Sequence, residues 1–305
     1  MHEMNLSTDL GGLTIQNPVI AASGTFGYGE EYIRAGDIGW FGAVSIKGTT
    51  IAPRVGNTPP RTCETPSGLL NSIGLENPGA EVVIGRKLPW LAQFKVPIIA
   101  NISAGSYHEF SELAGMFAQS PYVSALEVNV SCPNVKAGGM AFGTSPDTCY
   151  EATKAVRKRW EGPLIVKLTP NVTDITSIAE AAVEGGADVI SLINTLLGMA
   201  IDISSMRPVL GNVKGGLSGP AIKPVALRCV WEVSQAVSVP VIGMGGIFSA
   251  QDALEFIMAG ANAVALGTGL LTDPEMPRKV VLGIREYCAA RGVGSLQEIV
   301  GTAWD

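Results

Sequence analysis

Residues 126–143 read Leu-Glu-Val-Asn-Val-Ser-Cys-Pro-Asn-Val-Lys-Ala-Gly-Gly-Met-Ala-Phe-Gly, an apolar run that gives way at once to polar and reactive residues. Residues 125–128 are predicted to form a buried strand, because apolar side chains on both faces are typical of a parallel strand covered on both sides. Pro133 lacks a backbone N–H, so the strand is expected to end before it. Cys132 therefore follows the carboxyl end of a buried strand, and the glycines behind it predict a loop that closes over a ligand.

The same plan recurs along the chain and predicts a (β/α)8 TIM barrel. Eight apolar runs are expected to be strands, at residues 18–22, 43–46, 97–100, 125–128, 164–166, 189–193, 241–244 and 263–266. Helical patterns lie between them, including residues 81–93, 109–119, 147–160, 174–184, 224–236, 250–259 and 274–290. Eight strand-then-helix units suit one barrel domain over residues 1–305. A doubly wound sheet is the alternative, but the sequence contains neither Gly-x-Gly-x-x-Gly nor a Walker loop.

Two further features complete the predicted barrel. Residues 6–16, divided by Gly11 and Gly12, are predicted to form a β-hairpin that covers the amino-terminal end of the barrel. The connections at residues 48–80 and 195–223 are too long for a minimal barrel. Because long ordered loops commonly carry function, we expect both to lie over the active-site face.

The composition excludes several classes of protein. Lys and Arg number 21 against 27 Asp and Glu, a net charge of -6, which leaves no basic stripe for nucleic acid or an anionic membrane. The apolar runs are too short to span a bilayer and the first residues do not resemble a signal peptide, so a cytoplasmic protein is expected. The five cysteines include no Cys-x-x-Cys pair, which argues against disulfides and an all-Cys metal site.

Polar residues and glycines end nearly all the predicted strands. In a TIM barrel the carboxyl ends of the strands form the catalytic face. The residues at these ends are Ser23, Lys47, Asn101, Asn129, Lys167, Asn194, Gly245, Gly246, Gly267 and Thr268. Each alone has a structural explanation, since Asn is common in turns and Lys reaches solvent. Together they converge on one concave face, which predicts a ligand site.

Two glycine-rich turns follow the seventh and eighth predicted strands, at residues 241–247 and 265–269. Backbone N–H groups in such turns cradle a phosphate, and barrels commonly place a phosphate there. Tight packing at strand-to-helix corners is the structural alternative. Because two such turns occur in the expected pair of positions, the sequence favours a phosphate-bearing ligand.

Three reactive side chains remain for the chemistry. Lys47 and Lys167 end different strands, so one is expected to neutralise an anionic substrate while the other stabilises negative charge on a cofactor ring. Neither histidine, His2 or His108, ends a predicted strand, which argues against a Ser-His-Asp arrangement and a multi-His metal site. Cys132 is the best-placed acid, base or nucleophile. The alternative for a free Cys is a small buried apolar residue, and this is expected for Cys149, Cys229 and Cys288.

With these residues in place, the chain resembles the dihydroorotate dehydrogenases, flavin enzymes of pyrimidine synthesis. The resemblance rests on Ala-Ala-Ser-Gly at 21–24, Ser-Ile-Lys-Gly at 45–48, Asn-Ser-Ile-Gly-Leu-Glu-Asn-Pro-Gly at 71–79, Asn-Val-Ser-Cys-Pro-Asn at 129–134, Ile-Asn-Thr at 193–195, Gly-Gly-Leu-Ser-Gly at 215–219 and the two glycine-rich turns. The loop at 135–143 is similar to the NAD-linked (1B) group of class 1. Membrane-bound relatives usually have Ser at the position of Cys132 and carry an additional amino-terminal segment.

The resemblance implies FMN at the barrel mouth, with dihydroorotate or orotate beside it. The phosphate of FMN is expected on Gly245, Gly246, Gly267 and Thr268, and the rest of FMN among Ser23, Lys47, Gly48, Asn101, Asn129, Lys167, Ile193 and Gly219. The substrate is expected to contact Lys47, Asn71, Ser72, Ile73, Gly74, Leu75, Asn129, Asn134, Asn194 and Thr195. Cys132 would be the catalytic base, with Lys47 as the second catalytic residue, and no metal is expected.

The resemblance to the NAD-linked group also implies a second subunit that carries FAD and a [2Fe–2S] cluster, on a homodimeric core within a heterotetramer. The chain itself has neither a nicotinamide fingerprint nor a Cys cluster for electron relay. The alternatives are a fumarate-linked homodimeric dihydroorotate dehydrogenase, another flavin barrel that acts on a pyrimidine, a lyase that forms a Schiff base at Lys167, and a non-catalytic phosphate-ligand binder.

Overall fold

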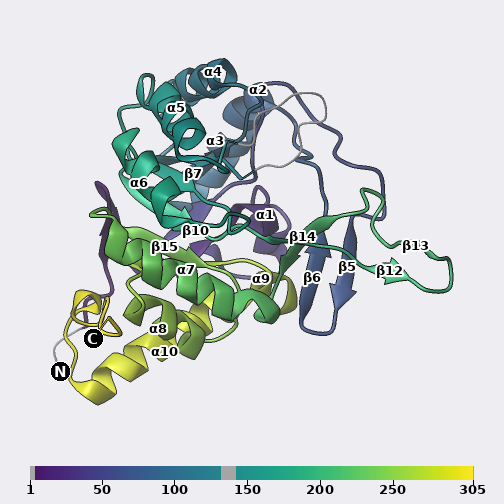
Figure 1. Cartoon of the computed structure of the whole chain (residues 1–305). Coiled ribbons are helices and arrows are strands. Elements are labelled where there is room, and N and C mark those ends of the chain that lie inside the picture. The colour runs from purple at the N-terminus through teal and green to yellow at the C-terminus, as the bar shows by residue number, and fades with distance from the viewer. Residues whose placement is uncertain (1–3, 132–141, 305) are drawn as a thin grey trace.

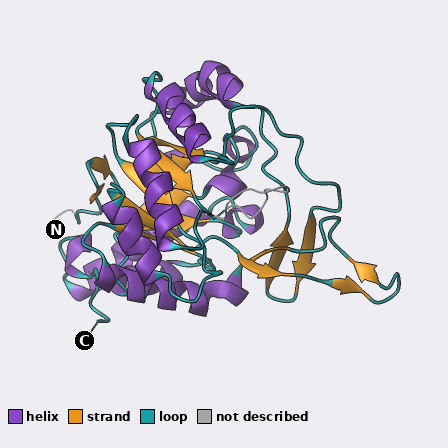
Figure 2. Ribbon diagram, turned by 45° about the horizontal axis from the view of Figure 1, so that its top comes forward, coloured by secondary structure: helices purple, strands orange, loops and turns teal. Residues whose placement is uncertain are grey.

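Eight short strands pair in parallel and close into a barrel in the computed structural model, which describes residues 4–131 and 142–304 (Figures 1 and 2). Around the barrel the strands are β10 (Val189–Leu192), β15 (Val241–Met244), β16 (Ala263–Leu266), β3 (Val19–Ala21), β4 (Ala43–Ser45), β7 (Ile98–Ile102), β8 (Ala125–Asn129) and β9 (Leu164–Lys167). All eight lie at the predicted segments, so the barrel prediction is confirmed.

Helices cover the outside of the barrel (Figure 2). The long ones are α4 (Tyr107–Ala118), α5 (Pro146–Arg157), α6 (Thr176–Glu184), α7 (Lys223–Ala236), α8 (Ala250–Met258) and α10 (Met276–Arg291), all at predicted positions. Three of them begin after a serine whose hydroxyl accepts a hydrogen bond from the N–H three residues later, namely Ser106, Ser145 and Ser249. These caps satisfy N–H groups that the first helical turn leaves free, and so fix where the helices begin. No helix in the described residues has the length and apolar character of a bilayer-spanning segment.

The connection after β3 lacks a long helix. It forms only α1 (Ser23–Phe26) and the 3-10 turns η1 (Tyr32–Arg34) and η2 (Ile38–Trp40). Gly27 and Gly29 take positive φ values of 64° and 90°, which a continuing helix does not allow. The expected strand-then-helix unit is therefore reduced here to a helix of four residues.

The helix predicted over residues 81–93 is irregular. It consists of α2 (Ala80–Val82), the π-helical turn η3 (Val83–Lys87), α3 (Leu88–Leu91) and the 3-10 turn η4 (Ala92–Phe94). Pro89 has no N–H to donate to the carbonyl of residue 85, so the regular α-helical pattern is broken there. Periodicity alone does not show such a break.

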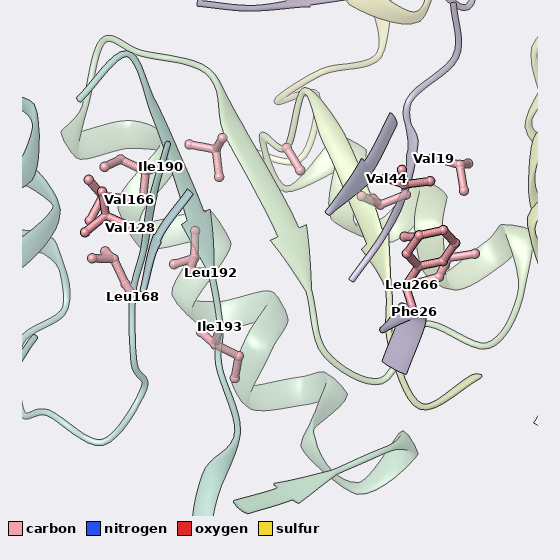
Figure 3. Close-up of a cluster of buried hydrophobic side chains, with 14 of the residues drawn as sticks. Val19, Phe26, Val44, Val128, Val166, Leu168, Ile190, Leu192, Ile193 and Leu266 are labelled. Atoms are coloured by element: carbon pink, nitrogen blue, oxygen red, sulfur yellow. The ribbon is translucent and has the colours of Figure 1, made fainter. Parts of the chain in front are cut away.

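The strand side chains alternate between two buried layers. Outward-facing residues such as Val19, Val44 and Val128 pack under the helices in one large cluster (Figure 3). Inward-facing residues such as Ile20 and Ala43 belong to a second cluster inside the barrel. Burial on both faces explains why these strands read as continuous apolar runs.

The hairpin of β1 (Thr8–Leu10) and β2 (Leu13–Ile15) closes the amino-terminal end of the barrel, as predicted. Its side chains Leu10, Leu13 and Ile15 join the inner cluster, which includes the first residues of several barrel strands. Gly11 turns the hairpin with φ 61°, and a Cβ there would lie 2.6 Å from the Cβ of Asp188. The hairpin therefore contacts the barrel so closely that only glycine fits at its turn.

The two long connections lie at the opposite end of the barrel and form a sheet that sequence patterning did not predict. The sheet is antiparallel, in the order β11 (Leu196–Gly198), β14 (Gly215–Ser218), β6 (Gly68–Asn71) and β5 (Thr62–Thr65). Between β11 and β14, the strands β12 (Ile201–Asp202) and β13 (Arg207–Pro208) form an arm that projects from the molecule (Figure 1). The expectation that both connections cover the active-site face is thus met by an ordered sheet.

Candidate active site

A cavity of about 650 Å³ opens at the carboxyl ends of the barrel strands, under the four-stranded sheet. The predicted site residues that line it are Ser23, Lys47, Gly48, Asn71, Ser72, Ile73, Gly74, Leu75, Asn101, Asn129, Lys167, Ile193, Asn194, Thr195, Gly219, Gly245, Gly246, Gly267 and Thr268. Cys132, Asn134 and most of the predicted loop at 135–143 lie outside the described residues. Every predicted site residue that the structure describes therefore faces one space, whose size suits a cofactor with a small substrate.

A layer of buried polar side chains lies between this cavity and the apolar cluster inside the barrel. At its centre is Glu127 of β8, which is 4% exposed. Its Oε2 accepts hydrogen bonds from Ser45 Oγ at 2.9 Å and Asn101 Nδ2 at 2.6 Å, and its Oε1 accepts one from Ser191 Oγ at 2.9 Å. These residues satisfy one another across β4, β7, β8 and β10, so the floor of the cavity is held by hydrogen bonds. The sequence prediction missed Glu127, although a lone carboxylate in an apolar strand was a visible signal.

Ser131 links two asparagines that face the cavity. Its hydroxyl donates to Asn129 Oδ1 at 2.5 Å and accepts from Asn194 Nδ2 at 2.5 Å. Asn194 Oδ1 in turn accepts a hydrogen bond from the N–H of Thr195 at 2.8 Å. Because Asn129 Oδ1 and Asn194 Nδ2 both bond Ser131, the orientation of each amide is fixed, and the Nδ2 donor of Asn129 has no partner among the described residues.

The two predicted cations lie in different surroundings. Lys167 is 6% exposed and forms no ion pair with a residue in the described part of the chain. Burial lowers the pKa of the Lys47 ammonium below its usual range and Arg61 lowers it further, whereas Glu76 and Glu31 act in the opposite direction. A buried cation without a partner is costly, so the Lys167 ammonium is suited to receive negative charge from a ligand, and the half-buried Lys47 faces the same cavity.

The two glycine-rich turns form a cradle. Gly245 and Gly246 have φ values of 123° and 77°, and a Cβ on Gly246 would lie 2.7 Å from the Cβ of Lys223. The N–H groups of Gly246 and Ile247 donate no hydrogen bond to any described residue. In the neighbouring turn, the hydroxyl of Thr268 donates to Ser218 Oγ at 2.8 Å. Free N–H groups beside glycines are what a phosphate requires.

The segment from Asn71 to Leu75 is held from behind by side chains whose role was not evident in the sequence. Arg61 bonds Glu76 Oε2 at 2.6 Å and the carbonyl oxygen of Val55 at 2.9 Å. Leu75 has a positive φ of 55°, and its carbonyl oxygen accepts from Asn77 Nδ2 at 2.7 Å. These contacts anchor the carboxyl end of the segment to the loop around Val55.

Several lining residues were not predicted because the four-stranded sheet brings them to the cavity. They are Thr62, Leu69, Asn171, Leu197, Asn212, Lys214, Gly215, Gly216 and Ser218, together with others. Asn171 shows how this happens: its Oδ1 accepts from the N–H of Leu197 at 2.8 Å and so joins a barrel loop to β11. The run Gly215 to Gly219 was noticed in the sequence, but its position depended on a strand pairing that patterning does not reveal.

The three cysteines that were predicted to be small buried apolar residues are buried. Cys149, Cys229 and Cys288 are buried, and burial raises the pKa of the Cys149 thiol to about 12. A thiol with so high a pKa is inert at neutral pH. Within the described residues, no three His, Cys, Asp or Glu side chains gather as metal ligands.

Comparison with known proteins gives consistent results. A sequence profile described as dihydroorotate dehydrogenase matches residues 5–287. Similar proteins include the dihydroorotate dehydrogenase B (NAD(+)) catalytic subunits of Geotalea daltonii, 50% identical over 99% of this chain and 99% of the relative, and of Geobacillus kaustophilus, 51% identical over 98% and 96%. The protein with that description from Desulforudis audaxviator is 52% identical over 96% of both chains.

Proposed function

The chain belongs to the dihydroorotate dehydrogenase family, and from this premise we propose that its cavity holds FMN with dihydroorotate stacked beside the flavin ring. The enzyme oxidises dihydroorotate to orotate in pyrimidine biosynthesis. The observation that carries the proposal is the convergence of all the described predicted site residues on one cavity. FMN, when bound, supplies the acceptor for the hydride that dihydroorotate loses.

The residues present fit FMN. The cradle at Gly246 and Ile247 offers free N–H groups to its phosphate, and Thr268 adds a hydroxyl. Lys167 provides a buried positive charge for the ring, where reduction adds negative charge. Asn101 Oδ1 is a buried acceptor without a partner among the described residues, which suits a ring N–H.

The substrate is proposed to lie between Lys47 and the amides of Asn129 and Asn194. Dihydroorotate carries a carboxylate and two ring amides, so one cation and several asparagines complement it. The contribution of Asn134, from outside the described residues, remains a prediction. Lys47 would bind the carboxylate, and the fixed amide ends of Asn129 and Asn194 would orient the ring.

Cys132 is proposed to be the base, although it lies outside the described residues. It follows Ser131, which lines the cavity, so its place in the chain supports this role. The thiolate would take a proton from the ring carbon beside a carbonyl while the neighbouring carbon loses a hydride, and the two losses form the carbon–carbon double bond of orotate.

The names of the relatives support a partner subunit. They are called catalytic subunits of an NAD(+)-linked enzyme, and we propose that this chain likewise passes its electrons to an FAD and [2Fe–2S] subunit on a homodimeric core. The projecting arm supports an assembly, since Met199, Ile201, Ile203 and Met206 are between 47% and 87% exposed there. A cluster of exposed apolar side chains such as this one is typical of a protein–protein interface. The free buried thiols suit the reducing cytoplasm that we also propose.

The proposal is tested with the purified chain and a Cys132→Ala variant. The wild type should be yellow with a flavin spectrum, and orotate should perturb that spectrum. Cys132→Ala should keep FMN and orotate binding but reduce its flavin with dihydroorotate on the order of a hundredfold or more slowly, the size of a lost general base. A colourless protein would contradict the FMN site, and near wild-type turnover by the variant would contradict the base.

A further inference from the structure

Glu127 is a buried titratable side chain to which the proposed reaction gives no role. Both its oxygens are occupied by donors from other strands: Ser45 and Asn101 on Oε2, and Ser191 on Oε1. In the described part of the chain, no Lys, Arg or His forms an ion pair with it. Burial of a carboxylate is unfavourable in free energy. Apolar packing alone therefore does not account for Glu127 and the three polar side chains that bond it.

The contact with Asn101 determines the orientation of that amide. Because a carboxylate offers only acceptors, the end of Asn101 that lies 2.6 Å from Glu127 Oε2 must be Nδ2, the donor. The opposite end, Oδ1, is then turned away from Glu127. It is buried and has no hydrogen-bond partner among the described residues.

The free Oδ1 lies beside Gly48 at the cavity wall. A Cβ at Gly48 would lie 2.9 Å from this oxygen, and both residues line the cavity. The φ of Gly48 is not in the left-handed region, so the backbone there does not require glycine. Alanine at this position would place a methyl group against Asn101 Oδ1, whereas glycine leaves this acceptor uncovered.

From these contacts we infer that Glu127 is a positioning residue: it holds the Asn101 amide so that its carbonyl oxygen faces the cavity and accepts a hydrogen bond from the imide N–H of the flavin ring. The inference rests on the proposed FMN site. Ser45 shares Oε2 of the carboxylate with Asn101, and Gly48 keeps the acceptor uncovered.

Asn101→Asp tests the inference by nearly isosteric replacement. The NH2 group that meets Glu127 Oε2 becomes an oxygen, so two carboxylates oppose each other and the side chain at position 101 is displaced from its orientation. FMN affinity of the deflavinated protein, measured by quenching of flavin fluorescence, should fall about tenfold or more, since one paired contact becomes a clash of acceptors. The flavin absorbance bands of the reconstituted variant should also shift relative to the wild type.

The double variant Glu127→Gln/Asn101→Asp exchanges the two groups. The new amide at position 127 can now donate to the new carboxylate at position 101, whose second oxygen again faces the cavity as an acceptor. FMN affinity should therefore recover to within about threefold of wild type. Ser191→Ala is the matched control, because it weakens the network while it leaves the contact between Glu127 and Asn101 in place. It should change the melting temperature but keep FMN affinity within about twofold.

Two results would overturn the inference: a folded Asn101→Asp protein with wild-type FMN affinity, or a double variant that binds FMN no better than Asn101→Asp alone. A change in orotate affinity with FMN affinity unchanged is a case of the first result, since orotate has an imide N–H too. If Asn101→Asp does not fold, the double variant alone decides, and an FMN affinity more than about threefold below wild type overturns the inference. A wild-type chain that binds no FMN would instead contradict the proposed function.

Discussion

Ser131 sets the orientation of two amides at once. Its hydroxyl donates to Asn129 and accepts from Asn194, so Ser131→Ala should remove one of the hydrogen bonds that orient each of these side chains. We expect the KM for dihydroorotate to rise roughly five- to tenfold with a smaller change in kcat, because about one hydrogen bond of orientation is lost for the bound ring. Ser103→Ala is the control, since Ser103 is buried, does not line the cavity, and its hydroxyl has no hydrogen-bond partner among the described residues. Equal KM values for the two variants would contradict this role.

We predict that Lys47, proposed to bind the substrate carboxylate, makes substrate binding sensitive to pH. Burial holds the pKa of its ammonium below the ordinary value for lysine. The group is charged below that pKa and neutral above it, so orotate affinity should fall as pH rises through a range lower than that in which an exposed lysine titrates. Lys47→Met should bind orotate weakly at all pH values, and its affinity should no longer fall as the pH rises. Titration of the flavin spectrum with orotate measures the affinity of the wild type and of Lys47→Met at each pH. A wild-type affinity that did not change up to the pH at which an exposed lysine titrates would contradict the role of Lys47.

At this scale, the position of a residue could be predicted from the sequence where that residue ends a barrel strand. Once the strands are located, their carboxyl ends must share one face, so Lys47, Asn101 and Lys167 could be placed together. Glu127 was missed because it lies within a strand, where the pattern predicts only packing. The partners of its two oxygens come from other strands and depend on barrel register, which a linear pattern does not contain.

Among the elements, the amino-terminal hairpin stabilises the barrel without touching the cavity. Gly11→Ala should be strongly destabilising, because its φ is 61° and the new Cβ would lie 2.6 Å from the Cβ of Asp188. Gly12→Ala is a matched control: φ is also positive, at 94°, but the nearest atom would be 4.0 Å away. We expect the first variant to lose about 2–4 kcal/mol of unfolding free energy and the second about 1 kcal/mol, measured in urea. Equal losses would show that the hairpin turn does not contact the barrel closely.

The barrel elements were predictable and the covering sheet was not, for one physical reason. Each barrel strand and helix can be predicted from the apolar pattern of its own few residues. The sheet instead pairs β6 with β14, so that Asn71 Nδ2 bonds the carbonyl oxygen of Gly216 across 145 positions of sequence. Short strands that are half exposed, such as β5, have no strong pattern of their own.

At the scale of the whole molecule, the exposed apolar side chains of the arm support the proposal that this chain works with a partner subunit. The isolated chain should oxidise dihydroorotate with an artificial dye but reduce NAD hardly at all, because a substrate stacked on the flavin leaves little room for a nicotinamide. Adding the electron-transfer subunit should restore NAD reduction. Ile203→Asp places a charge on the arm, where the side chain is 87% exposed, and should weaken assembly without loss of dye-linked activity. Robust NAD reduction by the chain alone would contradict the need for a partner, and efficient reduction of fumarate would assign the chain to the homodimeric group.

The central claim is that one cavity holds FMN and dihydroorotate together and carries the oxidation to completion. Anaerobic addition of dihydroorotate to the purified chain, with no other electron acceptor present, tests it most directly by following the visible absorbance of the flavin and the orotate formed. The account predicts that the flavin is bleached and that orotate appears in an amount equal to the flavin reduced. A flavin that stays oxidised in the presence of excess dihydroorotate, or a chain that carries no flavin, would contradict it.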